Sequence, residues 1–294
     1  SHYPVFKAHP ALFKVVAACD IIKERRDMIA GDFPDCKMFR RFSDMLDERD
    51  IDLVDIATCS TDHVKHALMS LERGRWTLLE SPMALTLDDA QLLRGAATKA
   101  KNRLLVLQRG LFAPDFLLAK SVMGDPRLGE IYQICIRRED FIRRDDWQTV
   151  KRLGGGAAYY AMTDLILQAL KILPQPPIQM WSELKRVASL GDAEDYAHVN
   201  LKTRTQISAD IEFNGGVLPP SRSPSFIIRG ERGVFSVNAD SPSGTLTVVD
   251  PEYRFSRRRS SVRTPPLADM HEDVPVVTCE VSLPKDTLHG PSAF

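Results

Sequence analysis

Several features that would direct a chain to a particular class of protein are missing from these 294 residues. The charge is balanced, with 39 lysines and arginines against 39 aspartates and glutamates, so general attraction to nucleic acid or to an anionic membrane is not indicated. No apolar run approaches the roughly 20 residues that cross a bilayer. The five cysteines show no C-x-x-C spacing, which favours reduced thiols in a cytoplasmic protein over disulfides or a zinc site. We therefore expect a cytoplasmic protein without nucleic-acid or membrane partners.

The glycine-rich fingerprint G-x-G-x-x-G, which cradles a dinucleotide diphosphate at the start of a doubly wound sheet, is also missing. The one glycine cluster, Gly154 to Gly156, lies in the second half of the chain. A nucleotide site therefore has to be inferred from other residues.

The first half of the chain alternates apolar runs with segments of helical periodicity. Residues 53–58 are apolar enough for a strand that is buried on both faces. We predict strands at 13–20, 53–58, 76–80 and 104–107, and helices at 23–33, 44–48, 61–73 and 86–100. Such alternation is typical of α/β proteins with a doubly wound parallel sheet.

After Pro114 the pattern changes. A helix at 114–123, a strand at 131–139 and a long helix at 156–173 are followed by strands without intervening helices, at 206–213, 226–229, 233–238 and 245–249. The second half is therefore predicted to be an α+β domain with an open-faced, mainly antiparallel sheet and a helix behind it. We place the domain boundary near residue 110, with domains at 1–110 and 111–294.

Asp20 ends the first predicted strand, and ligands of doubly wound sheets bind beyond the carboxyl ends of the strands. A carboxylate there accepts hydrogen bonds from the adenosine ribose and repels a 2′-phosphate, which favours NAD over NADP. The alternative is a solvated aspartate that caps the helix starting at Lys23. His63 and His66 share one helix face, but no nearby acid or cysteine completes a metal site, so no metal is expected.

Two stretches resemble a known family. The first runs from Ile51 through Thr58 and His63 to Leu85 and closes with Glu80-Ser81-Pro82, and the second runs from Asp146 through the three glycines to Leu170. Both are similar to the glucose–fructose oxidoreductase / inositol dehydrogenase (Gfo/Idh/MocA) family, whose closing motif is Glu-Lys-Pro. The resemblance implies a Rossmann-like first domain. Because residues 2–7 resemble the latter part of the family's first helix, we expect the first strand and the glycine-rich loop to lie before Ser1.

The resemblance also implies which residues contact an NAD cofactor. Hydroxyls and backbone amides at the turn after residue 58 can reach the diphosphate and the nicotinamide ribose. Beside Asp20, the residues assigned to cofactor binding are Thr58, Ser60, His63, Glu80, Pro82, Gln108 and Trp147.

The catalytic positions depart from the family pattern. Ser81 stands at the position of the family's catalytic lysine, and Asp164 stands at the position of its histidine. Oxidation of a carbinol needs a proton acceptor and a group that stabilises the charge on the oxygen, and loss of one such stabiliser costs about 3 kcal/mol. Asp164 can serve as the base, and Ser81 can donate one neutral hydrogen bond. Tyr160 can add a phenol donor, with packing between the domains as the alternative.

Two functions remain open from the sequence. The first is an NAD-dependent oxidoreductase acting on a sugar, inositol or related polyol with a non-standard catalytic set. The second is a catalytically inactive homologue that binds a dinucleotide or a sugar. The resemblance further implies a homodimer or homotetramer that pairs through the C-terminal sheet, with part of the interface expected from the alternating residues Ile207, Ala209, Ile211 and Phe213.

Overall fold

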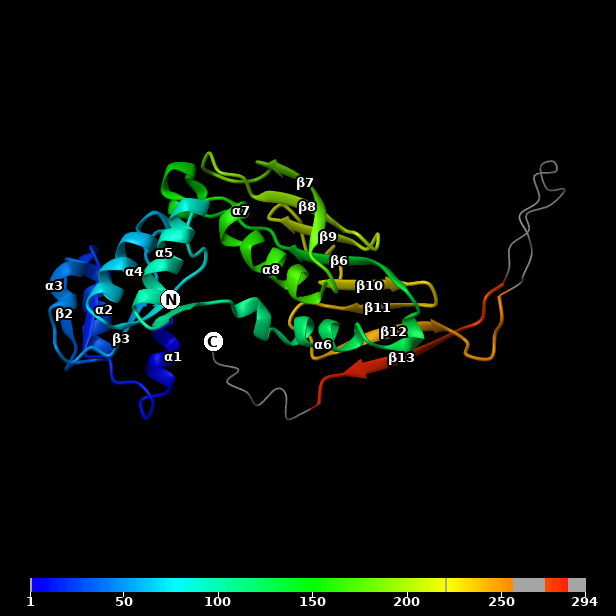
Figure 1. The fold of residues 1–294 in the computed structure, drawn as a ribbon. Helices are drawn as coiled ribbons and strands as arrows, with labels where there is room; N and C mark the ends of the chain where they lie inside the picture. Colours follow the sequence, from blue (N-terminus) through cyan, green and yellow to red (C-terminus); the bar gives the residue numbers. More distant parts are fainter. Residues whose placement is uncertain (1, 220, 256–272, 285–294) are drawn as a thin grey trace.

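The computed structural model describes residues 2–219, 221–255 and 273–284, which form an N-terminal and a C-terminal group of elements (Figure 1). The first group comprises α1 (Tyr3–Ala8), β1 (Ala17–Cys19), α2 (Lys23–Asp32), β2 (Lys37–Phe39), α3 (Phe42–Leu46), β3 (Leu53–Ile56), η1 (Ser60–Asp62), α4 (His63–Glu72), β4 (Trp76–Leu79), α5 (Leu87–Lys99) and β5 (Leu104–Val106). The connecting segment carries η2 (Arg109–Phe112).

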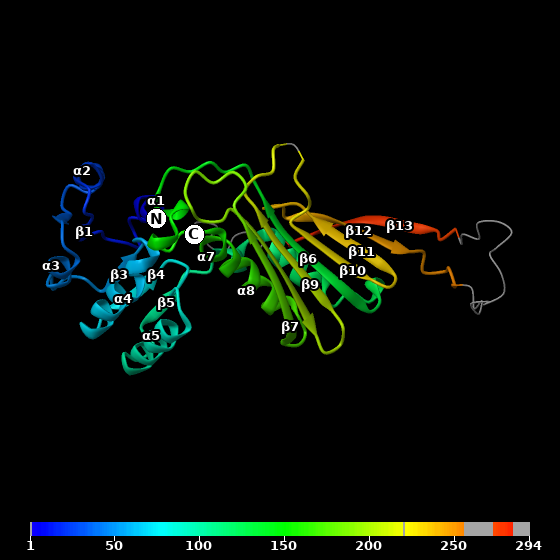
Figure 2. The ribbon, with the colours of Figure 1, turned by 90° about the horizontal axis from the view of Figure 1, so that it is seen from above.

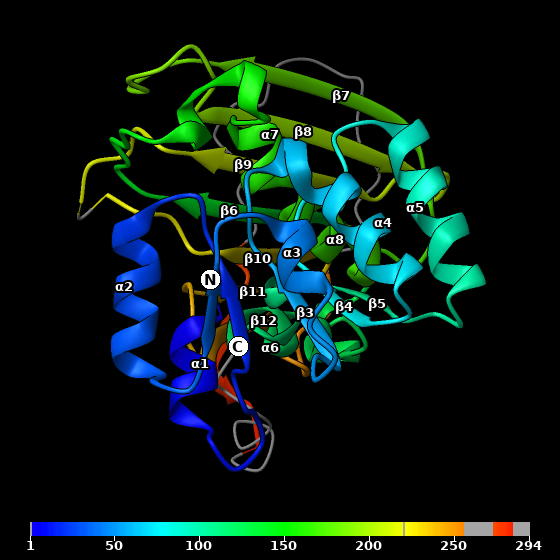
Figure 3. The same ribbon diagram turned by 90° about the vertical axis from the view of Figure 1, so that its left-hand side faces the viewer.

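All strands of the first group pair in parallel, β1 with β2 and β3 with β4 and β5. Figure 3 shows α1 and α2 on one side of these strands and α3, α4 and α5 on the other. Val54, Ile56 and Leu79 are 2% exposed or less, as expected of strands that are covered on both faces. The predicted Rossmann-like alternation is confirmed, with strands shorter than the apolar runs suggested.

The second group comprises α6 (Pro114–Val122), η3 (Pro126–Leu128), β6 (Ile131–Glu139), η4 (Trp147–Thr149), η5 (Lys151–Leu153), α7 (Ala157–Tyr160), α8 (Met162–Ile172), β7 (Pro177–Lys185), β8 (Tyr196–Thr203), β9 (Ser208–Asn214), β10 (Phe226–Gly230), β11 (Gly233–Val237), β12 (Ser243–Val249) and β13 (Val276–Ser282). Its strands form one eight-stranded sheet in the order β13-β12-β11-β10-β6-β9-β8-β7. Only the β6–β9 pair among these described strands is parallel, so the predicted antiparallel character is confirmed.

Two helices, α6 and α8, cover one face of this sheet (Figure 1). Alternate residues of the central strands point toward them, and the core includes Phe116 against Phe226, with ring centroids 6.2 Å apart. The sheet is seen along its length in Figure 2, extending away from the first group of elements.

The predicted dimer contacts at Ile207, Ala209, Ile211 and Phe213 are wrong. These four side chains are 9% exposed or less because they pack in the chain's own core. The helix predicted at 156–173 is also interrupted, at Ala161, which separates α7 from α8.

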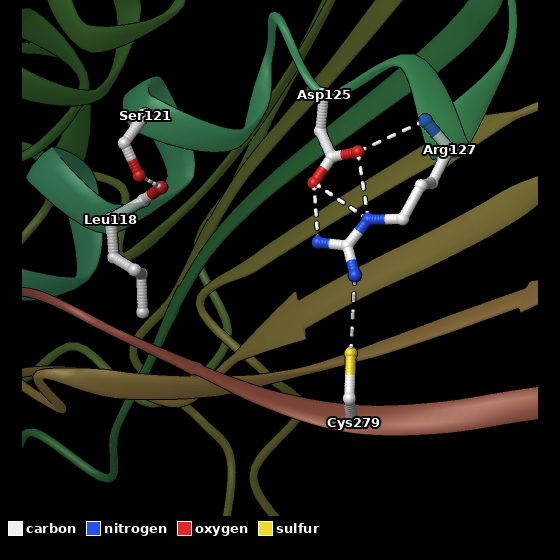
Figure 4. A network of polar contacts seen from close by, with 5 residues as sticks. All are labelled: Leu118, Ser121, Asp125, Arg127 and Cys279. Atoms are coloured by element: carbon white, nitrogen blue, oxygen red, sulfur yellow. Dashed lines mark hydrogen bonds and ion pairs between the residues drawn. The ribbon is translucent and has the colours of Figure 1, made fainter.

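The last described strand, β13, is fixed at its edge by a side-chain network (Figure 4). The Arg127 guanidinium donates to the Asp125 carboxylate, at 2.6 Å for the shortest contact, and to the Cys279 sulfur at 3.6 Å. These bonds to Arg127 hold the pKa of Asp125 below its usual value. Within the described ranges, no helix has the length and apolar character to cross a membrane.

Candidate functional site

The ends of the parallel strands gather several of the predicted cofactor residues. Asp20 follows β1, Thr58 and Ser60 follow β3, Glu80 follows β4 and Gln108 comes shortly after β5. Because β3, β4 and β5 pair in parallel, the residues that follow them lie at one edge of their sheet, and β1 packs against the same hydrophobic core.

The His63 side chain forms hydrogen bonds to the turn after β3 and to the turn after β4. Its ring is 1% exposed, with Nδ1 2.8 Å from the Pro82 carbonyl oxygen and Nε2 3.1 Å from the Thr58 carbonyl oxygen. The imidazole thus fixes the turn after β3 against the turn after β4, in which the Ser81–Pro82 peptide is cis.

The second histidine of that helix, His66, packs against an aromatic ring. The His66 ring lies 4.3 Å from the Phe42 ring, and burial lowers the pKa of His66. In the parts of the chain that the structure describes, no group of three or more histidine, cysteine or acidic side chains is placed to hold a metal ion.

The Asp20 carboxylate contacts the turn between β1 and α2, but it does not cap the helix that starts at Lys23. One carboxylate oxygen accepts the Ile22 backbone N–H at 2.8 Å, which stabilises the turn into α2. The other oxygen lies 3.5 Å from the guanidinium of Arg25, a side chain that is 63% exposed. A carboxylate at the strand end with an arginine beside it could receive either ribose hydroxyls or a phosphate.

Glu80 is the centre of a charged cluster that the sequence did not reveal. The His2 ring lies between two carboxylates, with Nδ1 2.7 Å from Asp55 and Nε2 3.4 Å from Glu80. Arg109 approaches the same Glu80 oxygen at 3.9 Å, and the Ser81 N–H donates to the other oxygen at 3.3 Å. The one available signal was Asp55, an acid inside an otherwise apolar strand; the positions of His2 and Arg109 depend on tertiary packing.

Asp164 lies in the first turn of α8, against η2. A methyl group at Gly110 would stand 3.6 Å from the Asp164 Cβ, and the Gly110 carbonyl accepts the Gln168 amide at 2.6 Å. The Asp164 Oδ1 atom is buried and has no hydrogen-bond partner among residues 2–219, 221–255 and 273–284. Burial raises the pKa of Asp164, opposed by Arg109, and the Glu80 carboxylate raises it further. Asp164 is therefore a carboxyl group packed against η2, within electrostatic reach of Glu80 and Arg109, with an Oδ1 atom that is unpartnered in the described part of the chain.

Tyr160 is oriented differently. Its ring packs edge-on against Phe213, with centroids 5.4 Å apart, and burial raises its pKa to about 12, with a contribution from Asp195. Its charged neighbours are thus not those of Asp164, and its contacts are those of the packing alternative.

The glycine cluster joins the two halves of the site. Gly154 has a positive φ of 74°, and a Cβ there would stand 2.8 Å from Leu85 Cδ1 and 3.1 Å from Ser60 Cβ. The turn at Gly154 therefore packs against the segment after β3, at Ser60, and against the segment after β4, at Leu85. The preceding η4 carries Trp147, and the Gln148 carbonyl accepts the Gly156 N–H at 2.9 Å, so Trp147 is held next to this junction.

A separate hollow of about 460 Å³ lies behind the turn, between α4 and α5. Of the predicted residues only Ser60 lines it; the others in its wall are Thr61, Val64, Lys65, Leu68, Met69, Leu85 and Asp89.

A parallel α/β domain with polar side chains at its strand ends, joined to an open-faced sheet, defines a two-domain fold of the Rossmann-like, nucleotide-binding type. The chain belongs to the Gfo/Idh/MocA family. A family model described as an oxidoreductase family with an NAD-binding Rossmann fold matches residues 1–108, and the model of the family's C-terminal domain matches residues 116–236. The resemblance noted in the sequence is confirmed, and the chain is an NAD(P)-binding oxidoreductase of this type.

Two relatives illustrate the similarity. An uncharacterized oxidoreductase of Schizosaccharomyces pombe is 30% identical over 265 residues, which cover 86% of this chain and 72% of the relative. The scyllo-inositol 2-dehydrogenase (NADP(+)) of Bacillus subtilis is 24% identical over 217 residues, which cover 73% of this chain and 60% of that enzyme. The chain thus spans well under the full length of both relatives.

Solved structures agree in fold. An NAD-binding protein from Listeria innocua has a TM-score of 0.74 at 21% identity, covering 90% of this chain and 75% of that one. The WlbA dehydrogenase from Chromobacterium violaceum, in complex with NADH and UDP-GlcNAcA, has a TM-score of 0.71 at 22% identity, covering 82% of this chain and 70% of that one. At these identities the likeness concerns the fold.

Proposed function

We propose that the protein is an NAD-dependent oxidoreductase that oxidises a CH–OH group of a sugar, inositol or related polyol. The observation that carries the proposal is Asp164, a carboxyl group with a raised pKa and a buried oxygen that is unpartnered among the residues described, within electrostatic reach of Glu80 and Arg109. A polyhydroxy substrate offers O–H donors to such an acceptor. Named relatives include the scyllo-inositol dehydrogenase above and a D-apiose dehydrogenase from Paraburkholderia graminis, 24% identical over 273 residues.

The residues at the strand ends fit a nicotinamide dinucleotide. Asp20 would accept hydrogen bonds from the adenosine ribose, and its negative charge favours NAD over NADP. Thr58 and Ser60 would offer hydroxyls, while His63 holds the turns that carry them. On the nicotinamide side we assign Glu80, Pro82, Gln108 and Trp147; the Gln108 Oε1 atom is buried without a hydrogen-bond partner in the described residues and is available to a ligand.

The bound nicotinamide would accept the hydride that leaves the substrate carbon. Asp164 would take the proton of the substrate hydroxyl, so that the alcohol becomes a carbonyl and the proton passes from the carboxyl group to solvent. A raised pKa makes the carboxylate a better proton acceptor than an ordinary aspartate, because base strength follows the pKa. Ser81 would donate a hydrogen bond to the reacting oxygen. Tyr160 stays a candidate phenol donor, although its ring packs against Phe213.

One observation favours the inactive alternative. Ser81 is neutral at the position where the family has a lysine, and Glu80 and Asp164 place two carboxylates nearby. Negative charge opposes the formation of an alkoxide. A protein of this fold that binds NADH without turning over any substrate would match this second reading.

The test is a substrate screen of the full-length protein with NAD⁺ and with NADP⁺. Scyllo-inositol, myo-inositol, D-apiose and D-glucose are offered in turn, and formation of the reduced cofactor is followed by its absorbance. Turnover of at least one substrate with NAD⁺ preferred, and loss of that preference in Asp20→Ala, supports the proposal. Cofactor binding without turnover of any of them overturns it in favour of the inactive homologue.

We also propose self-association through the open face of the eight-stranded sheet. On that face His198 Nε2 lies 2.6 Å from Asp210, whose second oxygen is 3.6 Å from Arg137, and Trp181 packs edge-on against His198. Trp181 is 53% exposed in the single chain.

Light scattering at micromolar concentration should report a dimer or tetramer, and Trp181→Glu should dissociate it. Met180→Glu is the control. Met180 lies in the same strand as Trp181, but it pairs with the buried Leu201 and therefore sits on the other face of the sheet. A monomeric wild type rules the proposal out.

A further inference from the structure

The segment that connects the two domains brings a cation to the site. Arg109 opens η2 directly after Gln108, its side chain is 60% exposed, and its Nη2 atom stands 3.9 Å from Glu80 Oε1. Because that contact is long and the guanidinium faces solvent, the side chain is not committed to a buried partner.

The base of this side chain is fixed, although its tip is not. The next residue, Gly110, accepts a hydrogen bond on its carbonyl oxygen from the Gln168 side-chain amide at 2.6 Å, and a Cβ at Gly110 would stand only 2.9 Å from Gln168 Nε2. Gln168 is 1% exposed in α8, the helix that also carries Asp164. The Arg109 backbone is therefore held at a constant place between the turn after β4 and the first turn of α8.

Arg109 offsets the negative charge of the two carboxylates in this part of the site. Burial raises the pKa of Asp164, Arg109 opposes that rise and Glu80 adds to it, while the Arg109 guanidinium lies 3.9 Å from Glu80 and the next residue, Gly110, packs against Asp164. Without Arg109, Glu80 and Asp164 would leave the Ser81 turn with an excess of negative charge. An arginine supplies a permanent positive charge and five N–H donors, which suits an oxygen that becomes negative during the reaction.

We propose that Arg109 supplies the positive charge that stabilises the reacting oxygen of the substrate, in place of the cation that Ser81 lacks. The inference rests on the proposed oxidoreductase function and names the residue that would supply the positive charge that function needs. In this arrangement the catalytic cation comes from the interdomain segment rather than from the turn after β4. Ser81 and Arg109 then approach the substrate oxygen as a neutral donor and a charged donor, and Asp164 takes the proton.

The experiment compares Arg109→Met, Arg109→Lys and the control Arg204→Met, an exposed arginine in the turn between β8 and β9, in the full-length protein. With the substrate found in the screen, Arg109→Met should lower kcat by roughly 10²–10³-fold, as loss of one preorganised charge stabiliser does. Arg109→Lys should keep part of the rate, and the affinity for NADH should stay within about twofold in all three variants.

Two further readouts separate a catalytic role from a structural one. Since Arg109 lowers the pKa of Asp164, the acid limb of the kcat/KM profile should move to higher pH in Arg109→Met. Adding Ser81→Lys to Arg109→Met should restore much of the lost rate, because it returns a cation to the turn.

The outcomes are distinct. A wild type without turnover overturns the oxidoreductase function and this inference with it. An active wild type with an equally active Arg109→Met variant overturns the role of Arg109 alone. Loss of NADH binding or of folding in Arg109→Met, without rescue by Ser81→Lys, assigns Arg109 to cofactor binding or stability and also overturns the inference.

Discussion

Replacement of Asp164 by asparagine separates the chemistry of the site from its stability. The substitution keeps the size of the side chain and the Oδ1 acceptor but removes the base. General-base catalysis contributes about 10²–10⁴-fold to a rate. We expect a loss near the middle of this range, on the order of 10³-fold in kcat. The nearest other carboxylate, Glu80, already accepts the Ser81 N–H and lies beside His2 and Arg109, so it is poorly placed to replace the base.

The pH dependence of kcat/KM is a second test of Asp164 as the base. Burial raises the pKa of Asp164 above the ordinary value of 3.8, so wild-type kcat/KM for alcohol oxidation should rise with pH through that raised value as the carboxylate forms. The asparagine variant should lack this limb.

Stability should respond in the opposite direction. A carboxyl group whose pKa is raised in the folded state contributes stability below pH 3.8 that is lost as the pH rises through the folded-state pKa. At neutral pH the Asp164→Asn variant should therefore be at least as stable as the wild type in urea denaturation. Asp240→Asn, an exposed residue with a φ of 58° in the turn between β11 and β12, is the matched control. An Asp164→Asn variant with wild-type kcat, or one that is inactive because it has unfolded, would refute the reasoning.

Three further predictions concern the framework of the site. Gly154→Ala puts a Cβ at a φ of 74° and 2.8 Å from Leu85, so it should destabilise the protein by about 1–3 kcal/mol and weaken NADH binding, and an unchanged urea midpoint would contradict this. Burial lowers the pKa of His66, so wild-type stability should fall as the pH drops below 6.5, and His66→Gln should flatten that slope; equal slopes would argue against it. Phe226→Ala removes a ring that is 1% exposed and should cost about 3–5 kcal/mol, with a smaller loss indicating that the core around Phe116 collapses to fill the space.

The fold followed from the sequence where periodicity and turn residues agreed. Residues 131–139 form β6 as predicted, and the alternation after residue 206 gives β9 with Ala209 and Ile211 fully buried. The edge strand β7 was missed because most of its residues are exposed, so it lacks the alternation that marks a half-buried strand. The adjacent β8 does alternate between half-buried and buried residues, which is the pattern that predicts a half-buried strand.

The site was less predictable than the fold. The family resemblance predicts Asp164 as a site residue, and in the structure its carboxyl lies within electrostatic reach of Glu80. The direction in which an alternating strand buries its side chains was misjudged at Ile207 to Phe213, because one sequence does not say which face of a sheet its own helices cover. The position of Arg109 depends on how η2 packs against α8, which no local sequence pattern encodes.

The central claim is that the strand ends of the first domain bind NAD(H) beside Asp164. A calorimetric titration of the full-length protein with NADH and with NADPH tests it most directly. We predict micromolar affinity for NADH, weaker binding of NADPH, and a loss of NADH affinity in Asp20→Ala with none in Asp240→Asn. The absence of measurable binding for both cofactors would contradict the account.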